Sequence, residues 1–141
     1  AVCREDDALC FVRDDVDHAC AIEADGAVLT DLSATGFARA ALGREQLMGT
    51  AVTSLTDARL ALELGVDWVL HDGGLDAVQA FAALREVAGI TLYSGGIDGL
   101  ETARAVVDGG VFRLCLAADR LPGEPDTDTF ADYARLLGRC M

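Results

Sequence analysis

Short apolar runs alternate with stretches of helical periodicity along this chain. The apolar runs predict strands over Leu9–Val12, Ala27–Leu29, Leu47–Ala51, Trp68–His71, Thr91–Tyr93 and Phe112–Leu116. Helical periodicity follows each run, over Val16–Ile22, Gly36–Leu42, Leu55–Leu64, Asp76–Val87, Leu100–Val107 and Asp128–Leu137. Because strand and helix alternate in this way, the pattern predicts six successive β/α units around a parallel sheet.

Two of the predicted helices share a sequence pattern. Five residues recur after 45 positions: Leu55, Ala58, Arg59, Gly65 and Val66 return as Leu100, Ala103, Arg104, Gly110 and Val111. Any two amphipathic helices that end in glycine look alike, but identical spacing at five positions favours a true repeat. Similar units favour a barrel over an irregular α/β sheet, and the glycines are expected to form left-handed C-caps.

Length and charge limit what this chain can do. Its 141 residues suffice for a core, so we expect one domain over residues 1–141. A net charge of −13 disfavours nucleic acid as a partner, because a phosphate backbone attracts a basic face. All 11 basic residues are arginine, which excludes every reaction that needs a lysine of this chain.

No membrane segment or secretion signal is recognisable. No apolar run approaches the ~20 residues that span a bilayer, and no basic-then-apolar segment opens the chain. We therefore expect a soluble, cytoplasmic protein that does not contact membranes.

The segment Ser94-Gly95-Gly96-Ile97 lies between a predicted strand and a predicted helix. Two glycines let backbone N–H groups approach an anion, and a helix N-terminus adds partial positive charge. The segment therefore predicts a binding loop for a small phosphorylated ligand. The alternative is a tight β/α turn with Asp98 as the N-cap, and a carboxylate there would repel a phosphate.

Charged side chains follow several predicted strands. Asp14, Asp31 and Asp72 lie at or just past strand ends, which converge at one mouth in a barrel. Helix capping is the alternative for such aspartates. His71 is a candidate general acid–base, with a structural histidine as the alternative. Arg13 is expected to contact a ligand phosphate or to form a salt bridge in the acidic mouth.

Other strand residues are expected to pack. Trp68 and Tyr93 are predicted to fill the barrel interior. Cys10 and Cys115 lie in apolar runs, and we expect both to be small core residues.

Several motifs together resemble the thiamine-phosphate synthases and their TenI relatives. They are Cys10-Phe11-Val12-Arg13-Asp14-Asp15-Val16-Asp17 followed by Ala24-Asp25-Gly26, then Leu47-Met48-Gly49 with Ser54-Leu55, and Gly95-Gly96-Ile97. The resemblance runs nearly end to end and implies an α/β fold, a parallel (β/α) TIM-type barrel with its active site at the strand C-termini. The family has two β/α units ahead of Leu9–Val12, so this chain supplies six of the eight.

The resemblance also implies roles for particular residues. Asp14 matches the family's magnesium-binding aspartate, and Asp31 lies two positions from the second one, which corresponds to Ser33. Oxygen ligands of this kind, with substrate phosphates, suit Mg²⁺. The glycine turn matches the phosphate loop, but Ala117 replaces a serine of the last strand, and Arg13 replaces an asparagine. The family's lysines are missing.

The function implied is the Mg²⁺-dependent joining of a pyrimidine diphosphate to a thiazole phosphate, in a degenerate or weakly active form. The alternative is a non-catalytic module of the same fold that binds a phosphorylated ligand or assists assembly. A third interpretation is another phosphate-binding barrel, such as the isomerases of histidine biosynthesis, which also use Ser-Gly-Gly-Ile turns.

Six units cannot close an eight-stranded barrel, and open parallel edges expose backbone groups and apolar surface. We expect one of three solutions: an upstream segment of a longer protein, a homodimer, or a six-stranded sheet that closes with distorted geometry. The chain begins with Ala1 rather than Met, and Ala1–Asp7 resembles the end of a helix, which leaves the upstream segment open.

Overall fold

Five parallel strands form one curved sheet in this chain. The computed structural model describes residues 2–5, 7–73, 91–111, 113–117, 119 and 127–138. The strands are β1 (Phe11–Arg13), β2 (Gly26–Leu29), β3 (Leu47–Val52), β4 (Trp68–His71) and β5 (Thr91–Ser94). They lie side by side in the order β1-β2-β3-β4-β5, so each strand pairs with the next one along the chain. The expected parallel α/β fold is confirmed.

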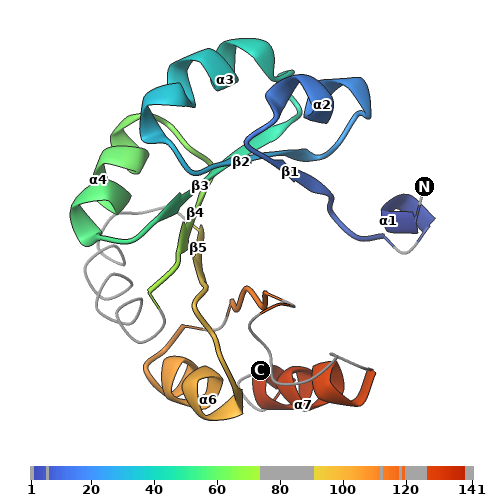
Figure 1. The fold of residues 1–141 in the computed structure, drawn as a ribbon, viewed down its shortest axis with the longest axis vertical. Helices are drawn as coiled ribbons and strands as arrows, with labels where there is room; N and C mark the ends of the chain where they lie inside the picture. Colours follow the sequence, from blue (N-terminus) through green and yellow to red (C-terminus); the bar gives the residue numbers. More distant parts are fainter. Residues whose placement is uncertain are drawn as a thin grey trace.

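Apart from the short first helix, which precedes β1, the helices follow the strands and lie outside the sheet. They are α1 (Val2–Glu5), α2 (Val16–Ala21), the short 3₁₀ helix η1 (Leu32–Ala34), α3 (Thr35–Ala41), α4 (Leu55–Glu63), α6 (Leu100–Asp108) and α7 (Thr127–Gly138). Figure 1 shows the helices from α2 to α7 along the outer side of an arc that stays open between the N-terminal segment and α7. The helix expected over Asp76–Val87 lies outside the described residues. No helix in the described part is long and apolar enough to span a membrane.

The expected sixth strand is reduced to a single bridge. Leu114 pairs with Ser94 in parallel, and the Ser94 N–H donates to Arg113 O at 2.8 Å while the Cys115 N–H donates to Ser94 O at 2.7 Å. The described residues 113–117 pair with β5 on one side only, so few hydrogen bonds hold them in an extended conformation. The sheet is therefore open, and the expected closure of six distorted strands is wrong.

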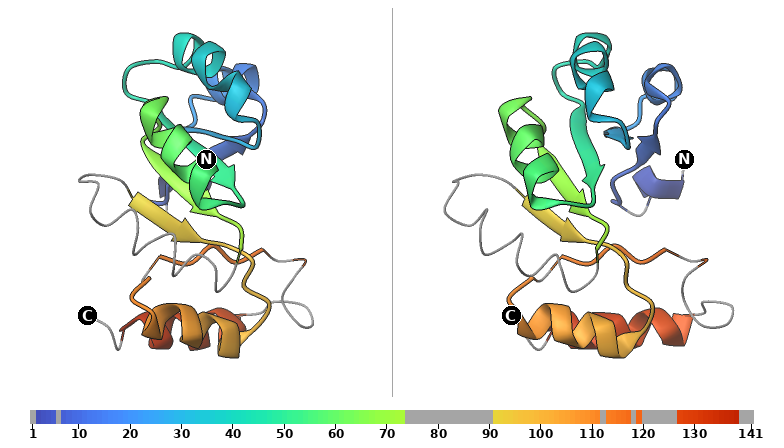
Figure 2. Two further views of the ribbon diagram at one scale, coloured as in Figure 1. Left: turned by 90° about the vertical axis from the view of Figure 1, so that its left-hand side faces the viewer. Right: turned by 60° about the vertical axis from the view of Figure 1, so that its left-hand side comes forward.

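The core lies between the sheet and its helices. Met48 and Val69 point from the strands toward the helices and are fully buried, as are Ala58 and Ala61 of α4. Alanines on the inner helix faces let the helices lie close to the sheet, where apolar burial contributes about 25 cal/mol per Å². A second apolar cluster joins α6 to α7, which pack side by side (Figure 2).

Three helices end in the same hydrogen-bonded turn. Gly65 after α4 and Gly110 after α6 are left-handed, with φ of +77° and +96°. In each turn this residue donates to the carbonyl three positions earlier, and the next residue donates to the carbonyl five positions earlier. These bonds define the Schellman C-cap, so the predicted left-handed caps are confirmed. Glu23 after α2 makes the same turn with φ +52°, a third copy without the glycine.

Replacing Glu23 by glycine should therefore stabilise the chain. A left-handed conformation costs a non-glycine residue about 1–2 kcal/mol. Part of that gain, about 0.5–1 kcal/mol, is lost because glycine has more conformational freedom in the unfolded state. A net gain of about 0.5–1 kcal/mol is expected in urea unfolding. Gly65→Ala should cost about 1 kcal/mol, since a Cβ there meets no atom within 4 Å and only φ is strained. A stabilised Gly65→Ala variant would contradict this account.

Candidate functional site

The C-terminal ends of the strands bring the chemically active side chains to one edge of the sheet. The ladder continues one residue past several strands: the N–H groups of Asp14, Asp72 and Gly95 each donate to the neighbouring strand at 2.9 Å. Because the strands are parallel, these three residues and Asp31 lie at the same edge. The C-terminal ends of the strands therefore correspond to the mouth that the sequence predicted.

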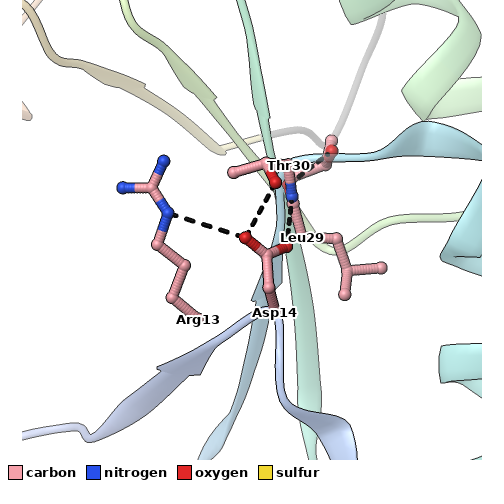
Figure 3. Close-up of polar contacts among 5 residues, drawn as sticks. Arg13, Asp14, Leu29 and Thr30 are labelled. Atoms are coloured by element: carbon pink, nitrogen blue, oxygen red, sulfur yellow. Dashed lines mark hydrogen bonds and ion pairs between the residues drawn. The ribbon is translucent and has the colours of Figure 1, made fainter.

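Asp14 links the first two loops of this edge. One carboxylate oxygen accepts from the Thr30 N–H and the other from Thr30 Oγ1, both at 2.7 Å (Figure 3). Arg13 Nε lies 3.8 Å from Oδ2 of Asp14, a long contact between exposed side chains that adds little stability. Asp14 has φ of +55°, which aspartate tolerates better than most residues. Thr30 was not predicted, because no periodic signal marks it.

Asp31 is held by its own loop. Its Oδ1 accepts from Ser33 Oγ at 2.7 Å and from the Ser33 N–H at 2.9 Å, and Asp31 is the N-cap of η1. The Ser33 hydroxyl first, and then the Ser33 N–H, hold the pKa of the Asp31 carboxyl below its ordinary value. Asp31 is thus a helix cap, as the alternative interpretation proposed. Asp15 is also a cap: it accepts from the His18 N–H at 2.9 Å at the start of α2.

Ser33→Ala should raise the pKa of Asp31 toward its ordinary value, because the stronger of two donors is removed. A depressed carboxyl pKa stabilises the folded state above the unfolded pKa, and this contribution is lost as pH falls through the folded pKa. An NMR titration of the Asp31 carboxyl carbon measures the change. An unaltered titration would show that the backbone donor alone sets the pKa.

Asp14 and Asp31 line one cavity with a suitable chemistry for Mg²⁺. The cavity holds about 410 Å³, lies between α2 and α3, and is also lined by Asp17, Thr30 and Phe37. Each carboxylate keeps lone pairs beyond those used for hydrogen bonds. No group of three or more histidine, cysteine, aspartate or glutamate side chains in the described part is placed to hold a metal. The two carboxylates thus fit Mg²⁺ only if water or ligand oxygens complete its shell.

The glycine loop is more crowded than a free phosphate cradle. The Gly95 N–H donates to the His71 carbonyl and so is not available to an anion. A Cβ at Gly95 would lie 2.9 Å from Oδ1 of Asp72. Ser94 is buried, and Ile97 belongs to the core between α6 and α7. Gly96 has φ of +68°, a conformation suited to glycine. The N–H groups after Gly95 are therefore the candidate donors to an anion.

Asp98 does not cap α6. The N-cap is Gly99, which has no capping side chain, and Asp98 instead accepts from Thr102 Oγ1. The alternative in which Asp98 caps this helix is therefore wrong. Burial and then the Asp98 carboxylate raise the pKa of Tyr133, so the Asp98 charge acts close to this loop. Ala117, expected beside the phosphate, is partly buried in the 113–117 segment.

His71 occupies the last position of β4 and is 2% exposed. Side chains alternate along a strand, and Trp68 and Leu70 line the concave side while Val69 lies in the core under the helices. His71 shares the face of Val69. This placement favours the alternative of a structural histidine over a general acid–base that faces the mouth.

The concave side of the sheet forms an apolar groove of about 610 Å³, lined among others by Phe11, Arg13, Trp68, Leu70, Tyr93 and Cys115. We call it the concave groove. The Trp68 ring meets Phe11 and Tyr93 edge to face, with centroids 5.1 and 5.3 Å apart, so the predicted interior packing of Trp68 and Tyr93 is confirmed.

Gly26 and Gly49, two glycines of the resemblance motifs for which no packing role was predicted, make this ring packing possible. A Cβ at Gly49 would lie 2.2 Å from the Trp68 ring, and one at Gly26 would lie 2.9 Å from the Phe11 ring. The rings of β1 and β4 therefore meet above the glycines of the two strands between them.

Cys115 differs from its expected core position, because it is exposed. Desolvation and then the Asp72 carboxylate raise the pKa of its thiol, while Arg13 acts in the opposite direction. The thiol is thus protonated at neutral pH and is a poor nucleophile. Cys10, expected in the core as well, is partly buried.

A solved structure shares this architecture. It is the thiamine phosphate pyrophosphorylase from Pyrococcus furiosus, which matches with a TM-score of 0.83 and 26% identity over 99% of this chain and 72% of its own. The chain has the TIM-like α/β fold of that protein. No protein-family model matches the sequence, and no curated protein does. The likeness to thiamine-phosphate synthases therefore holds at the level of the fold.

Proposed function

We propose that this chain is a relative of the thiamine-phosphate synthases that binds a phosphorylated ligand with Mg²⁺ at the C-terminal edge of its sheet. The observation that carries the proposal is the backbone likeness to the Pyrococcus furiosus enzyme over nearly the whole chain. Asp14 and Asp31 add to it, since both line one cavity at the edge where such barrels bind ligands.

The activity proposed is a slow joining of a pyrimidine diphosphate to a thiazole phosphate. Departure of a diphosphate needs positive charge on the leaving group. Mg²⁺ held by Asp14 and Asp31 would supply most of that charge. Arg13 supplies a protein cation at this site, since its Nε lies 3.8 Å from the Asp14 carboxylate. Because Asp72 and Asp98 place negative charge at the glycine loop, turnover should be weak.

A non-catalytic role in binding a phosphorylated ligand is the second candidate. The placement of His71 favours it, because the one histidine at a strand end faces the helices rather than the groove. Such a module would keep the glycine loop and the carboxylates but lack a proton-transfer group at the mouth.

Calorimetric titration with pyrophosphate and with thiamine phosphate, each with and without Mg²⁺, tests the site. We expect pyrophosphate to bind more tightly with Mg²⁺, and Gly96→Asp to weaken binding of both ligands by placing a carboxylate in the loop. Gly138→Asp is the matched control, because it adds the same charge at the end of α7, where a Cβ meets no atom within 4 Å.

An assay of coupling between the two precursors then separates the candidates. Turnover that requires Mg²⁺ supports the enzyme, and binding without turnover supports the module. Absence of binding under every condition contradicts both.

A further inference from the structure

Thr30 is bound to Asp14 through both its backbone and its side chain. The Thr30 N–H donates to Oδ1 of Asp14 and the Thr30 hydroxyl donates to Oδ2, both at 2.7 Å. The two residues lie one position past the ends of β2 and β1, which are neighbours in the sheet. Figure 3 shows Thr30 and Arg13 approaching the carboxylate from different directions. Each oxygen of Asp14 therefore accepts one hydrogen bond from the same residue.

This pair of bonds fixes the orientation of the carboxylate. The Asp14 side chain is 45% exposed, and one hydrogen bond would leave it free to turn about its last torsion, which is broad in aspartate. Two bonds to different oxygens restrict that torsion as well as the first one. The Arg13 contact of 3.8 Å is too long for a hydrogen bond and does not do this. The orientation of the Asp14 carboxylate thus follows from its bonds to Thr30.

The bonds to Thr30 leave the carboxylate able to bind a cation. An ionised carboxylate has about four acceptor positions, and Thr30 fills two of them. Asp14, Thr30 and Asp31 all line the cavity of about 410 Å³. Mg²⁺ requires near-ideal octahedral geometry, so it binds best to oxygens that are already held in place.

Thr30 also connects the two carboxylates of this cavity. It precedes Asp31 in the chain, and Asp31 is itself held by the Ser33 N–H and hydroxyl. The loop after β2 therefore carries one carboxylate and holds the other through Thr30. A cation that binds both carboxylates depends on the conformation of this one loop.

Only the hydroxyl bond depends on the residue type at position 30. Every residue except proline supplies the backbone N–H, whereas the hydroxyl bond needs threonine or serine. We propose that Thr30 is a positioning residue, whose hydroxyl holds the Asp14 carboxylate in the orientation that binds Mg²⁺ together with a phosphorylated ligand. This role rests on the proposed function of the site.

Thr30→Val tests this role, because valine has a similar shape and lacks the hydroxyl. The fold should stay intact, since Thr30 is exposed. Calorimetry should show about tenfold weaker binding of pyrophosphate with Mg²⁺, the lower end of the loss for a residue that supports a metal ligand. Without Mg²⁺ we expect no loss. Thr30→Ser returns the hydroxyl and should keep most of the affinity.

Thr53→Val is the matched control. Thr53 is also exposed and follows β3 at the same edge of the sheet, but it lines a different cavity beside Asp57. We expect its Mg²⁺-dependent binding to equal that of the parent. A loss that Thr53→Val shares, or that Thr30→Ser does not reverse, overturns the proposal.

A double-mutant cycle shows whether Thr30 acts through Asp14. In the Asp14→Asn background, Thr30→Val should have almost no further effect on Mg²⁺-dependent binding, because the carboxylate that Thr30 positions is gone. An undiminished loss in that background would make Thr30 an independent contact and overturn the proposal.

NMR couplings that report the χ1 rotamer of Asp14 give a readout without metal or ligand. We expect one rotamer in the parent and averaging in Thr30→Val, and a single rotamer in both overturns the proposal. If the parent binds pyrophosphate no better with Mg²⁺ than without it, the proposed function fails and the role of Thr30 fails with it. If the parent shows this dependence and Thr30→Val keeps it in full, the role of Thr30 fails alone.

Discussion

Asp14→Asn should weaken Mg²⁺-dependent binding of pyrophosphate by about 10- to 100-fold. Loss of a residue that only supports a metal ligand already lowers metal affinity by about this factor. Asparagine still accepts from the Thr30 N–H, which Asp14 does at 2.7 Å, so the loop should stay in place. Without Mg²⁺ the same variant should bind pyrophosphate as well as the parent or better, because a repelling charge is gone. Calorimetry at neutral pH with and without Mg²⁺ measures both effects.

Asp17→Asn is the matched control for this experiment. Asp17 lines the same cavity and carries the same charge, but it lies in the first turn of α2. We expect little change in the Mg²⁺ dependence of this variant. Equal losses in both variants would show that the net charge of the cavity matters and that Asp14 is not a metal ligand.

Gly26→Ala should destabilise the chain by about 3 kcal/mol or more, the upper end of the cost of overpacking. A Cβ there would lie 1.9 Å from Leu47 O, and backbone in the next strand cannot move aside as a flexible side chain can. Since domains of this size have about 5–15 kcal/mol of stability, much of the cooperative transition should be lost. Thermal and urea unfolding followed by circular dichroism measure this.

Gly36→Ala is the corresponding control, because this glycine lies in α3 and a Cβ there meets no atom within 4 Å. Alanine in a helix should instead add about 0.5–1 kcal/mol. A Gly26→Ala variant that melts with the parent would contradict the close approach of β2 and β3.

The sequence pattern predicted the fold where one physical rule governs a segment. Buried parallel strands need apolar runs, and all four residues of β4 were predicted. Left-handed caps favour glycine, so Gly65 and Gly110 were found, whereas Glu23 forms the same cap against that preference and gave no signal. An apolar run alone does not make a strand, which is why Phe112–Leu116 was overpredicted: the described part of this run pairs on one side only.

The site was predicted less completely, because it depends on contacts between loops. The position of Asp14 after a strand indicated the mouth, but its bonds to Thr30 join segments 16 residues apart and leave no periodic trace. His71 could have been placed from the sequence. It lies three positions after Trp68 in one strand, and an odd spacing puts two side chains on opposite faces.

The sheet order has a consequence for synthesis on the ribosome. Paired residues of neighbouring strands lie 15 to 23 positions apart, as in Phe11 with Gly26 and Trp68 with Thr91. At about 5–20 residues per second, each new strand emerges within a few seconds of the one it joins. The nascent chain can therefore add its units one after another, and each apolar strand is left uncovered only briefly before its partner arrives.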